Sequence, residues 1–106
     1  MYGAILGDMI GSPYEFDQGN KSKEFPLFTG KSHFTDDTVM TIAVAEALME
    51  TAGDPDDDVV LAVLVDRLQY WGRKYPVAGI GARFTGWLQQ DNPLPYGIYG
   101  HGLALR

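Results

Sequence analysis

Residues 35–74 read TDDTVMTIAVAEALMETAGDPDDDVVLAVLVDRLQYWGRK and contain the two longest helical patterns of the chain. The apolar residues of this stretch recur with the three- and four-residue spacing of amphipathic helices, interrupted once at Ala52-Gly53. The pattern predicts one helix from about Thr35 to Thr51 and another from about Pro55 to Lys74. Asp54 is the predicted N-cap of the second helix. Because that helix contains many apolar residues, we expect it to be the most buried element of the chain.

Two shorter helices flank this stretch, one from about Tyr2 to Gly11 and one from about Gly81 to Gln90. In the first helix, glycines recur every four residues and therefore share one face, which predicts a very close neighbour, either a backbone or a ligand; they are Gly3, Gly7 and Gly11. In the last helix we expect three side chains to point inward: Phe84, Trp87 and Leu88. No segment alternates with the period of a strand, so we expect an all-α fold. We expect a loop over residues 14–34.

The composition narrows the function classes. The 106 residues contain 8 Lys and Arg against 14 Asp and Glu, for a net charge of −6, and no Cys. This acidic balance disfavours nucleic acid or anionic lipid as a partner, and the missing Cys excludes a disulfide scaffold and a thiol nucleophile. The N-terminus has no basic targeting region, and the longest apolar run, Val59 to Val65, is too short to span a membrane. We expect one domain over residues 1–106, in the cytoplasm and without a membrane partner.

Thr35-Asp36-Asp37 is the sharpest candidate site. At a helix N-terminus these three oxygen-bearing side chains can turn toward one point, and hard cations such as Mg²⁺ prefer oxygen ligands. The alternative is that Thr35 caps the helix and the carboxylates interact with its dipole. Asp56-Asp57-Asp58 is better explained as a solvated helix start of that kind.

Three further motifs each allow a functional and a plain interpretation. Glu15 lies between aromatic residues and is either an acid/base of raised pKa or a solvated loop residue. Gly79-Ile80-Gly81 precedes a helix and is either a phosphate cradle or a turn. The segment around Tyr99 and His101 mixes tyrosines with glycines, which suits either stacking on a base or a surface loop.

In order and approximate spacing, four motifs together resemble the ADP-ribosylglycohydrolases, the family of dinitrogenase reductase-activating glycohydrolase and the ADP-ribosyl-acceptor hydrolases. Residues 3–16, GAILGDMIGSPYEF, resemble its opening, and residues 34–38, FTDDT, its first metal motif. Residues 75–81, YPVAGIG, resemble its phosphate-binding loop, and residues 99–106, YGHGLALR, are similar to its Tyr-Gly-Asn-Gly segment. The resemblance spans essentially the whole chain.

The resemblance implies an all-α orthogonal bundle with two Mg²⁺ ions, which cleaves the glycosidic bond between ADP-ribose and a protein side chain or related acceptor. By position, Thr35, Asp36 and Asp37 are then metal ligands, and Glu15 and Asp36 are the catalytic candidates. The implied contacts to ADP-ribose come from Gly79, Gly81, Tyr99 and His101, where His101 replaces the family's usual Asn.

The family's remaining metal ligands come from a C-terminal Asp-x-Asp motif, which has no counterpart in these 106 residues. We therefore expect an N-terminal portion or a shortened homologue, with half of the site and with exposed apolar surface that the missing portion or a second copy would cover. Two alternatives to hydrolysis remain: a catalytically inactive module that binds ADP-ribose or a nucleotide, and an oligomerisation fragment without a ligand.

Overall fold

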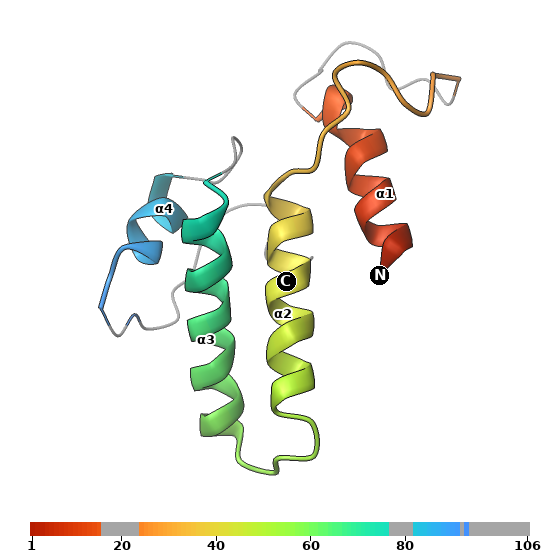
Figure 1. Ribbon diagram of the computed structural model, residues 1–106. Coiled ribbons are helices and arrows are strands. Elements are labelled where there is room, and N and C mark those ends of the chain that lie inside the picture. Colours follow the sequence, from red (N-terminus) through yellow and green to blue (C-terminus); the bar gives the residue numbers. More distant parts are fainter. Residues whose placement is uncertain (16–23, 77–81, 92, 94–106) are drawn as a thin grey trace.

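The computed structural model describes residues 1–15, 24–76, 82–91 and 93. Throughout these residues the regular elements are helical, and no strand occurs among them. They are α1 (Tyr2–Gly11), the short 3₁₀ helix η1 (Ser12–Tyr14), α2 (Asp36–Glu50), α3 (Asp57–Lys74) and α4 (Ala82–Leu88). Figure 1 shows α2 and α3 side by side and antiparallel, with α1 and α4 on opposite sides of this pair. The all-α prediction is confirmed.

Helix α2 begins as the sequence predicts. The Thr35 hydroxyl accepts a hydrogen bond from the Asp37 N–H at 3.2 Å, and Asp36 and Asp37 occupy the first turn, where the helix dipole favours negative charge. The helix ends at Glu50, and Gly53 has a φ of +82°, a left-handed conformation that glycine adopts without strain. This turn reverses the chain into α3.

Helix α3 begins two residues later than predicted. The N-cap is Asp56, whose carboxylate accepts from the Asp58 N–H at 3.0 Å, and the prediction of Asp54 was wrong. Asp54 instead accepts a hydrogen bond from the Asp56 N–H at 2.9 Å and so forms a local turn. Aspartate side chains commonly form such a turn in place of a helix N-cap. Asp56, Asp57 and Asp58 are all exposed, in agreement with a solvated helix start.

The core lies between α2, α3 and α4, and most of its fully buried residues come from α2 and α4. In the described part of the chain, Gly72 is the only residue of α3 that is fully buried, so the prediction of α3 as the most buried element was wrong. The reason is that α3 packs against α2 along one face and meets α4 only near its C-terminal end, which leaves Val59 and Leu61 exposed. The core cluster is Val39, Met40, Phe84, Trp87 and Leu88, with Val65, Leu68 and Trp71 packed against it.

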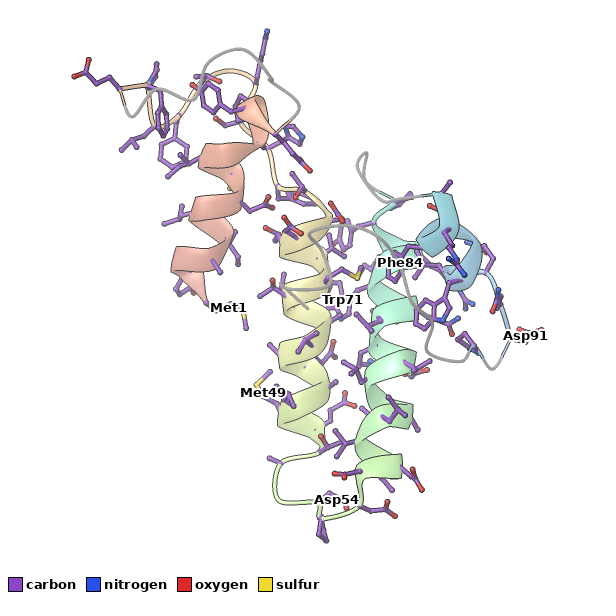
Figure 2. The ribbon with its side chains drawn as sticks, turned by 180° about the vertical axis from the view of Figure 1, so that it is seen from behind. Met1, Met49, Asp54, Trp71, Phe84 and Asp91 are labelled. Carbon is purple, nitrogen blue, oxygen red and sulfur yellow. The ribbon has the colours of Figure 1, made fainter. Side chains whose placement is uncertain are left out.

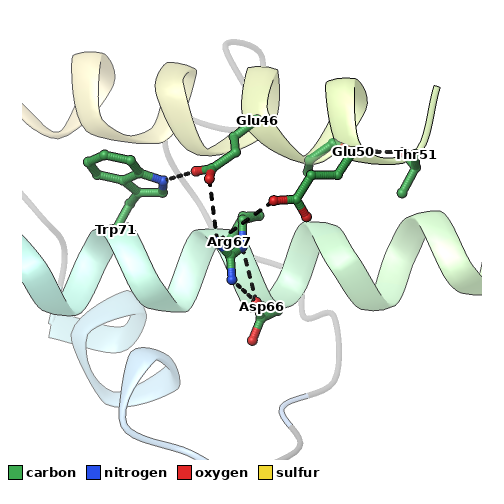
Figure 3. A network of polar contacts seen from close by, with 7 residues as sticks. Glu46, Glu50, Thr51, Asp66, Arg67 and Trp71 are labelled. Carbon is green, nitrogen blue, oxygen red and sulfur yellow. Dashed lines mark hydrogen bonds and ion pairs between the residues drawn. The ribbon is translucent and has the colours of Figure 1, made fainter.

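A polar network joins α2 to α3 (Figure 3). Glu46 of α2 accepts hydrogen bonds from the Trp71 indole N–H and from the Arg67 guanidinium, the latter at 3.4 Å. Arg67 also lies 2.5 Å from a carboxylate oxygen of Asp66 and 3.9 Å from one of Glu50. Because Trp71 is packed against the core, this network fixes the relative register of the two helices. Figure 2 shows the other face of α2, where Met49 points away from α3.

Helix α4 packs very closely on α3. Its buried side chains are Phe84, Trp87 and Leu88, as predicted, although the helix is shorter than the predicted range of residues 81–90. A Cβ atom built on Gly72 would lie 2.6 Å from Leu88 Cδ2, so only glycine fits there without a shift. By contrast, no described atom lies within 4 Å of a Cβ built on Gly3, Gly7 or Gly11. The predicted close neighbour of that glycine face is therefore absent from the described residues.

The expected exposed apolar surface is present. Helix α1 contains no fully buried residue, and large apolar side chains on several elements are more than a third exposed, including Tyr2, Leu6, Leu48 and Met49. The loop expected over residues 14–34 is confirmed for residues 24–34, which form no helix or strand. None of the helices that the structure describes is long and apolar enough to cross a membrane.

Candidate functional site

The Asp8 carboxylate ties α1 to the N-terminus of α2. Its Oδ2 accepts hydrogen bonds from the Thr35 N–H at 2.7 Å and from the Thr38 hydroxyl at 2.6 Å, and its Oδ1 accepts from the Thr35 hydroxyl at 2.6 Å. These are short contacts to a charged acceptor, which makes them stronger than neutral hydrogen bonds. They join residues that lie 27 and 30 positions apart in the sequence. The first metal motif suggested by the sequence is therefore held by α1.

A second tie runs in parallel to the first. The hydroxyl of Ser12, which is buried, accepts from the His33 N–H at 3.0 Å and donates to the Met9 carbonyl at 2.9 Å. It holds the segment that leads into α2 against the end of α1. Between them, Ser12 and Asp8 fix both the approach to Thr35 and Thr35 itself.

Glu15 lies within the electrostatic reach of the same region. Partial burial raises the pKa of Glu15 above its ordinary value of 4.5, and the negative charges of Asp36, Asp37 and Asp8 raise that pKa further. The charge of His33 acts in the opposite direction. Four carboxylates from three segments of the chain thus share one region of negative potential, of the kind that attracts a cation.

The donors around α2's first turn match a hard cation in kind. Thr35 and Asp36 are only 2% and 6% exposed, and with Asp37 they offer hydroxyl and carboxylate oxygens, the ligands that Mg²⁺ prefers. They fill only part of a cation's coordination shell: among the described residues, no three His, Asp or Glu side chains are grouped closely enough to hold a metal ion. The residues present fit part of a magnesium site, and further oxygen donors are needed to complete it.

The remaining sequence candidates lie outside the described residues. These are the predicted contacts to ADP-ribose, Gly79, Gly81, Tyr99 and His101. The described ends of the segment that contains Gly79 and Gly81 are Pro76, after α3, and Ala82, at the start of α4. Because α3 and α4 pack closely, the positions of Pro76 and Ala82 relative to each other are fixed by the two helices.

An apolar groove of about 270 Å³ opens beside the tie between α1 and α2. One wall is aromatic: the Trp71 and Tyr75 rings stack with centroids 5.9 Å apart, and Phe34 meets Tyr75 edge to face at 6.0 Å. The groove is lined by Ile5, Met9, Phe34, Thr38, Val39, Ile42, Trp71 and Tyr75. Helix α1 thus rests on α2 through the Asp8 hydrogen bonds and leaves space between their apolar side chains.

Sequence reasoning missed Asp8 and Ser12 as parts of the site. Neither was among the candidate site residues, although both lie in residues 3–16, which resemble the opening of the family. A signal for Asp8 was available, since an aspartate within an apolar helix needs hydrogen-bond partners when it is even half-buried. The sequence alone does not name those partners, because they are more than 25 residues away.

The sequence of the chain matches one family of known proteins. The family model described as ADP-ribosylglycohydrolase matches residues 1–103. The chain is also 30% identical over 82 residues to an uncharacterized protein, YegU, of Escherichia coli (strain K12), an alignment that covers 62% of this chain and 25% of YegU. The chain therefore spans about a quarter of the length of this curated relative, and no solved structure matches it significantly. Since the family model covers nearly all of its residues, the chain belongs to the ADP-ribosylglycohydrolase family.

Proposed function

We propose that this chain carries the N-terminal part of a magnesium-dependent active site, which hydrolyses the glycosidic bond between ADP-ribose and a protein side chain or related acceptor. The single observation that carries the proposal is the acidic region at the start of α2. There, Asp36 and Asp37 follow the buried Thr35, and partial burial together with the charges of both aspartates raises the pKa of Glu15. Membership of the family supplies the reaction class.

In this proposal Thr35, Asp36 and Asp37 hold the cation through their side-chain oxygens. Bound Mg²⁺ would orient the ribose hydroxyls and polarise the glycosidic bond or the attacking water. Further carboxylates come from a second copy or from additional chain, because the described residues supply too few. The resemblance assigns the diphosphate to the backbone amides at Gly79 and Gly81, and the adenosine to Tyr99 and His101; in this proposal they keep those roles.

Glu15 acts as the acid/base or substrate-orienting carboxylate in this proposal. A general acid or base works best when its pKa lies near the working pH, and partial burial and the surrounding negative charge move the pKa of Glu15 in that direction. A cation bound nearby would lower that pKa again, so the protonation state of Glu15 would respond to the loading of the site.

The assay for this proposal follows the release of ADP-ribose from an ADP-ribosylated protein, with Mg²⁺ or with EDTA. We expect release that requires Mg²⁺ and falls at least 100-fold in Asp36→Ala, in keeping with the usual cost of losing an electrostatic catalytic group. The exposed Asp57→Ala is the matched control, since it also removes a carboxylate from a helix start. Release that is equally fast in EDTA, or in Asp36→Ala, would refute the proposed metal role.

A second candidate function is binding of ADP-ribose without turnover. The observation that favours it is the small number of metal donors among the described residues. In that case ADP-ribose binds with the same affinity in Mg²⁺ and in EDTA, and no release of ADP-ribose is detected. Oligomerisation without any ligand would give neither binding nor release.

A further inference from the structure

The function proposed above does not use Asp8, although Asp8 accepts three hydrogen bonds from the start of α2. Asp8 lies on α1, and all three of its hydrogen-bond donors belong to Thr35 or Thr38. A half-buried carboxylate with three such donors is held in one orientation, and it holds the donors in turn. One of these donors, Thr35, is the first residue of the proposed metal motif.

The Thr35 hydroxyl can donate one hydrogen bond and can accept through two lone pairs. Its proton goes to Asp8 Oδ1, at an oxygen–oxygen distance of 2.6 Å. One lone pair accepts from the Asp37 N–H at 3.2 Å. The second lone pair is the remaining capacity of the hydroxyl, and with the proton committed to Asp8 this oxygen can only accept. A cation needs a ligand oxygen in that state.

We propose that Asp8 is a positioning residue, which fixes the Thr35 hydroxyl as an acceptor toward a divalent cation. Asp8 does not touch the cation and acts through Thr35. The inference rests on the proposed function, because it requires Thr35 to be a metal ligand. Hydrogen-bond partners of metal ligands commonly change metal affinity by about 10- to 100-fold when they are mutated, because they orient the ligand and increase its basicity.

Thr38 provides a matched control within the same cluster. Its hydroxyl also donates to Asp8 at 2.6 Å, it is also buried, and it lies one helical turn further along α2. Thr38→Val removes one hydrogen bond to Asp8 and keeps both bonds between Asp8 and Thr35. If Asp8 only staples α1 to α2, losing Thr38 and losing Asp8 should have effects of the same kind. If Asp8 orients Thr35, only the loss of Asp8 should weaken metal binding.

The first experiment measures the affinity of the whole chain for Mn²⁺, from the electron paramagnetic resonance signal of the free ion. We expect Asp8→Asn to weaken binding at least 10-fold, and Thr38→Val to change it less than about twofold. Thr35→Ser keeps the hydroxyl and should retain affinity within about threefold, whereas Thr35→Ala should lose as much as Asp8→Asn. In a Thr35→Ala background, Asp8→Asn should then cost less than about twofold more, because the two residues act as one unit.

The second measurement uses the unmutated chain, so it does not depend on whether a variant folds. Proton NMR should show the Thr35 hydroxyl proton in slow exchange, and this resonance should persist when Mg²⁺ is added. A proton that exchanges at the solvent rate in the presence of Mg²⁺ would overturn the inference, since the hydroxyl would then not be committed to Asp8.

The other outcomes separate this inference from the proposed function. If Asp36→Ala loses Mn²⁺ affinity but Asp8→Asn does not, the positioning role of Asp8 is wrong and the proposed metal site stands. Equal losses in Asp8→Asn and Thr38→Val, or additive losses of Asp8 and Thr35, also overturn the inference and make Asp8 a structural staple. If Asp36→Ala leaves Mn²⁺ affinity unchanged, the metal role fails and the inference fails with it. If the unmutated chain binds no Mn²⁺, Thr35 is not a metal ligand in this chain and the inference fails, whereas a metal site completed by additional chain still stands.

Discussion

Replacing Gly72 by alanine tests how closely α4 must approach α3. The new Cβ would lie 2.6 Å from Leu88 Cδ2, 2.8 Å from Leu88 Cδ1 and 3.3 Å from Leu88 Cγ. Ordinary contacts between carbon atoms are about 3.5 to 4.0 Å, so Leu88 or the whole of α4 has to move by about 1 Å. Leu88 is only 3% exposed and belongs to the core cluster, so its side chain cannot simply swing into water.

Two opposing terms set the magnitude. Overpacking of a well-packed core costs about 1–3 kcal/mol, and the higher helix propensity of alanine returns about 1 kcal/mol. We expect Gly72→Ala to lower the free energy of unfolding by about 1 kcal/mol. Gly7→Ala is the matched control: it lies inside α1 with no described atom within 4 Å of the new Cβ, and it should gain about 0.5–1 kcal/mol.

The assay is urea unfolding of both variants beside the unmodified chain, followed by helical circular dichroism. Leu88→Ala adds a double-mutant cycle: the Gly72→Ala methyl should fill part of the cavity that Leu88→Ala leaves, so the double variant should lose less stability than the sum of the single ones. If Gly72→Ala raised the free energy of unfolding as much as Gly7→Ala does, the close packing of Leu88 on Gly72 would be refuted. Since residues 77–81 connect these two helices, that result would also refute the fixed ends of the segment containing Gly79 and Gly81.

Three further predictions concern single side chains. Met40→Ala, at a residue 1% exposed in the core, should cost about 2–5 kcal/mol in urea unfolding, and a cost below 1 kcal/mol would contradict its place there. Glu46→Ala leaves the Trp71 indole N–H without its acceptor and should cost about 1–3 kcal/mol, whereas Glu50→Ala, 3.9 Å from Arg67, should cost less than half of that. Glu15→Gln should equal or exceed the unmodified chain in free energy of unfolding at pH 7, by no more than about a few tenths of a kcal/mol because Glu15 is largely exposed. Since the raised pKa makes the folded state bind the Glu15 proton more tightly, the unmodified chain should gain on the variant as the pH falls through that pKa toward 4.5, and a variant that is less stable at pH 7 would exclude the repulsion.

The helices could be predicted because their signals are local. Thr35 with two aspartates after it indicates an N-cap, and Ala52-Gly53 indicates a stop, whatever surrounds them. The error at Asp54 and Asp56 is of the same local kind, since two aspartates two residues apart compete to form the turn and the cap. Such a choice shifts a helix boundary and leaves the helix itself in place.

What could not be predicted depends on contacts between distant segments. The apolar residues of α3 suggest burial all around. Burial depends, however, on how many neighbours surround the helix, and among the described residues α3 has close neighbours on part of its surface only. The close approach at Gly72 and the open surroundings of Gly7 are invisible to a sequence pattern for the same reason. The same holds for the candidate site. Thr35, Asp36 and Asp37 are adjacent in the sequence and could be predicted together, whereas Asp8 was identified only from its three hydrogen bonds in the structure.

The most direct test of the central claim is a calorimetric titration of ADP-ribose into the purified chain, with Mg²⁺ and with EDTA. We expect binding that requires Mg²⁺ and that Asp36→Ala abolishes, while the exposed control Asp57→Ala leaves it unchanged. Binding of equal strength in EDTA, or binding that survives Asp36→Ala, would contradict a metal site at the start of α2.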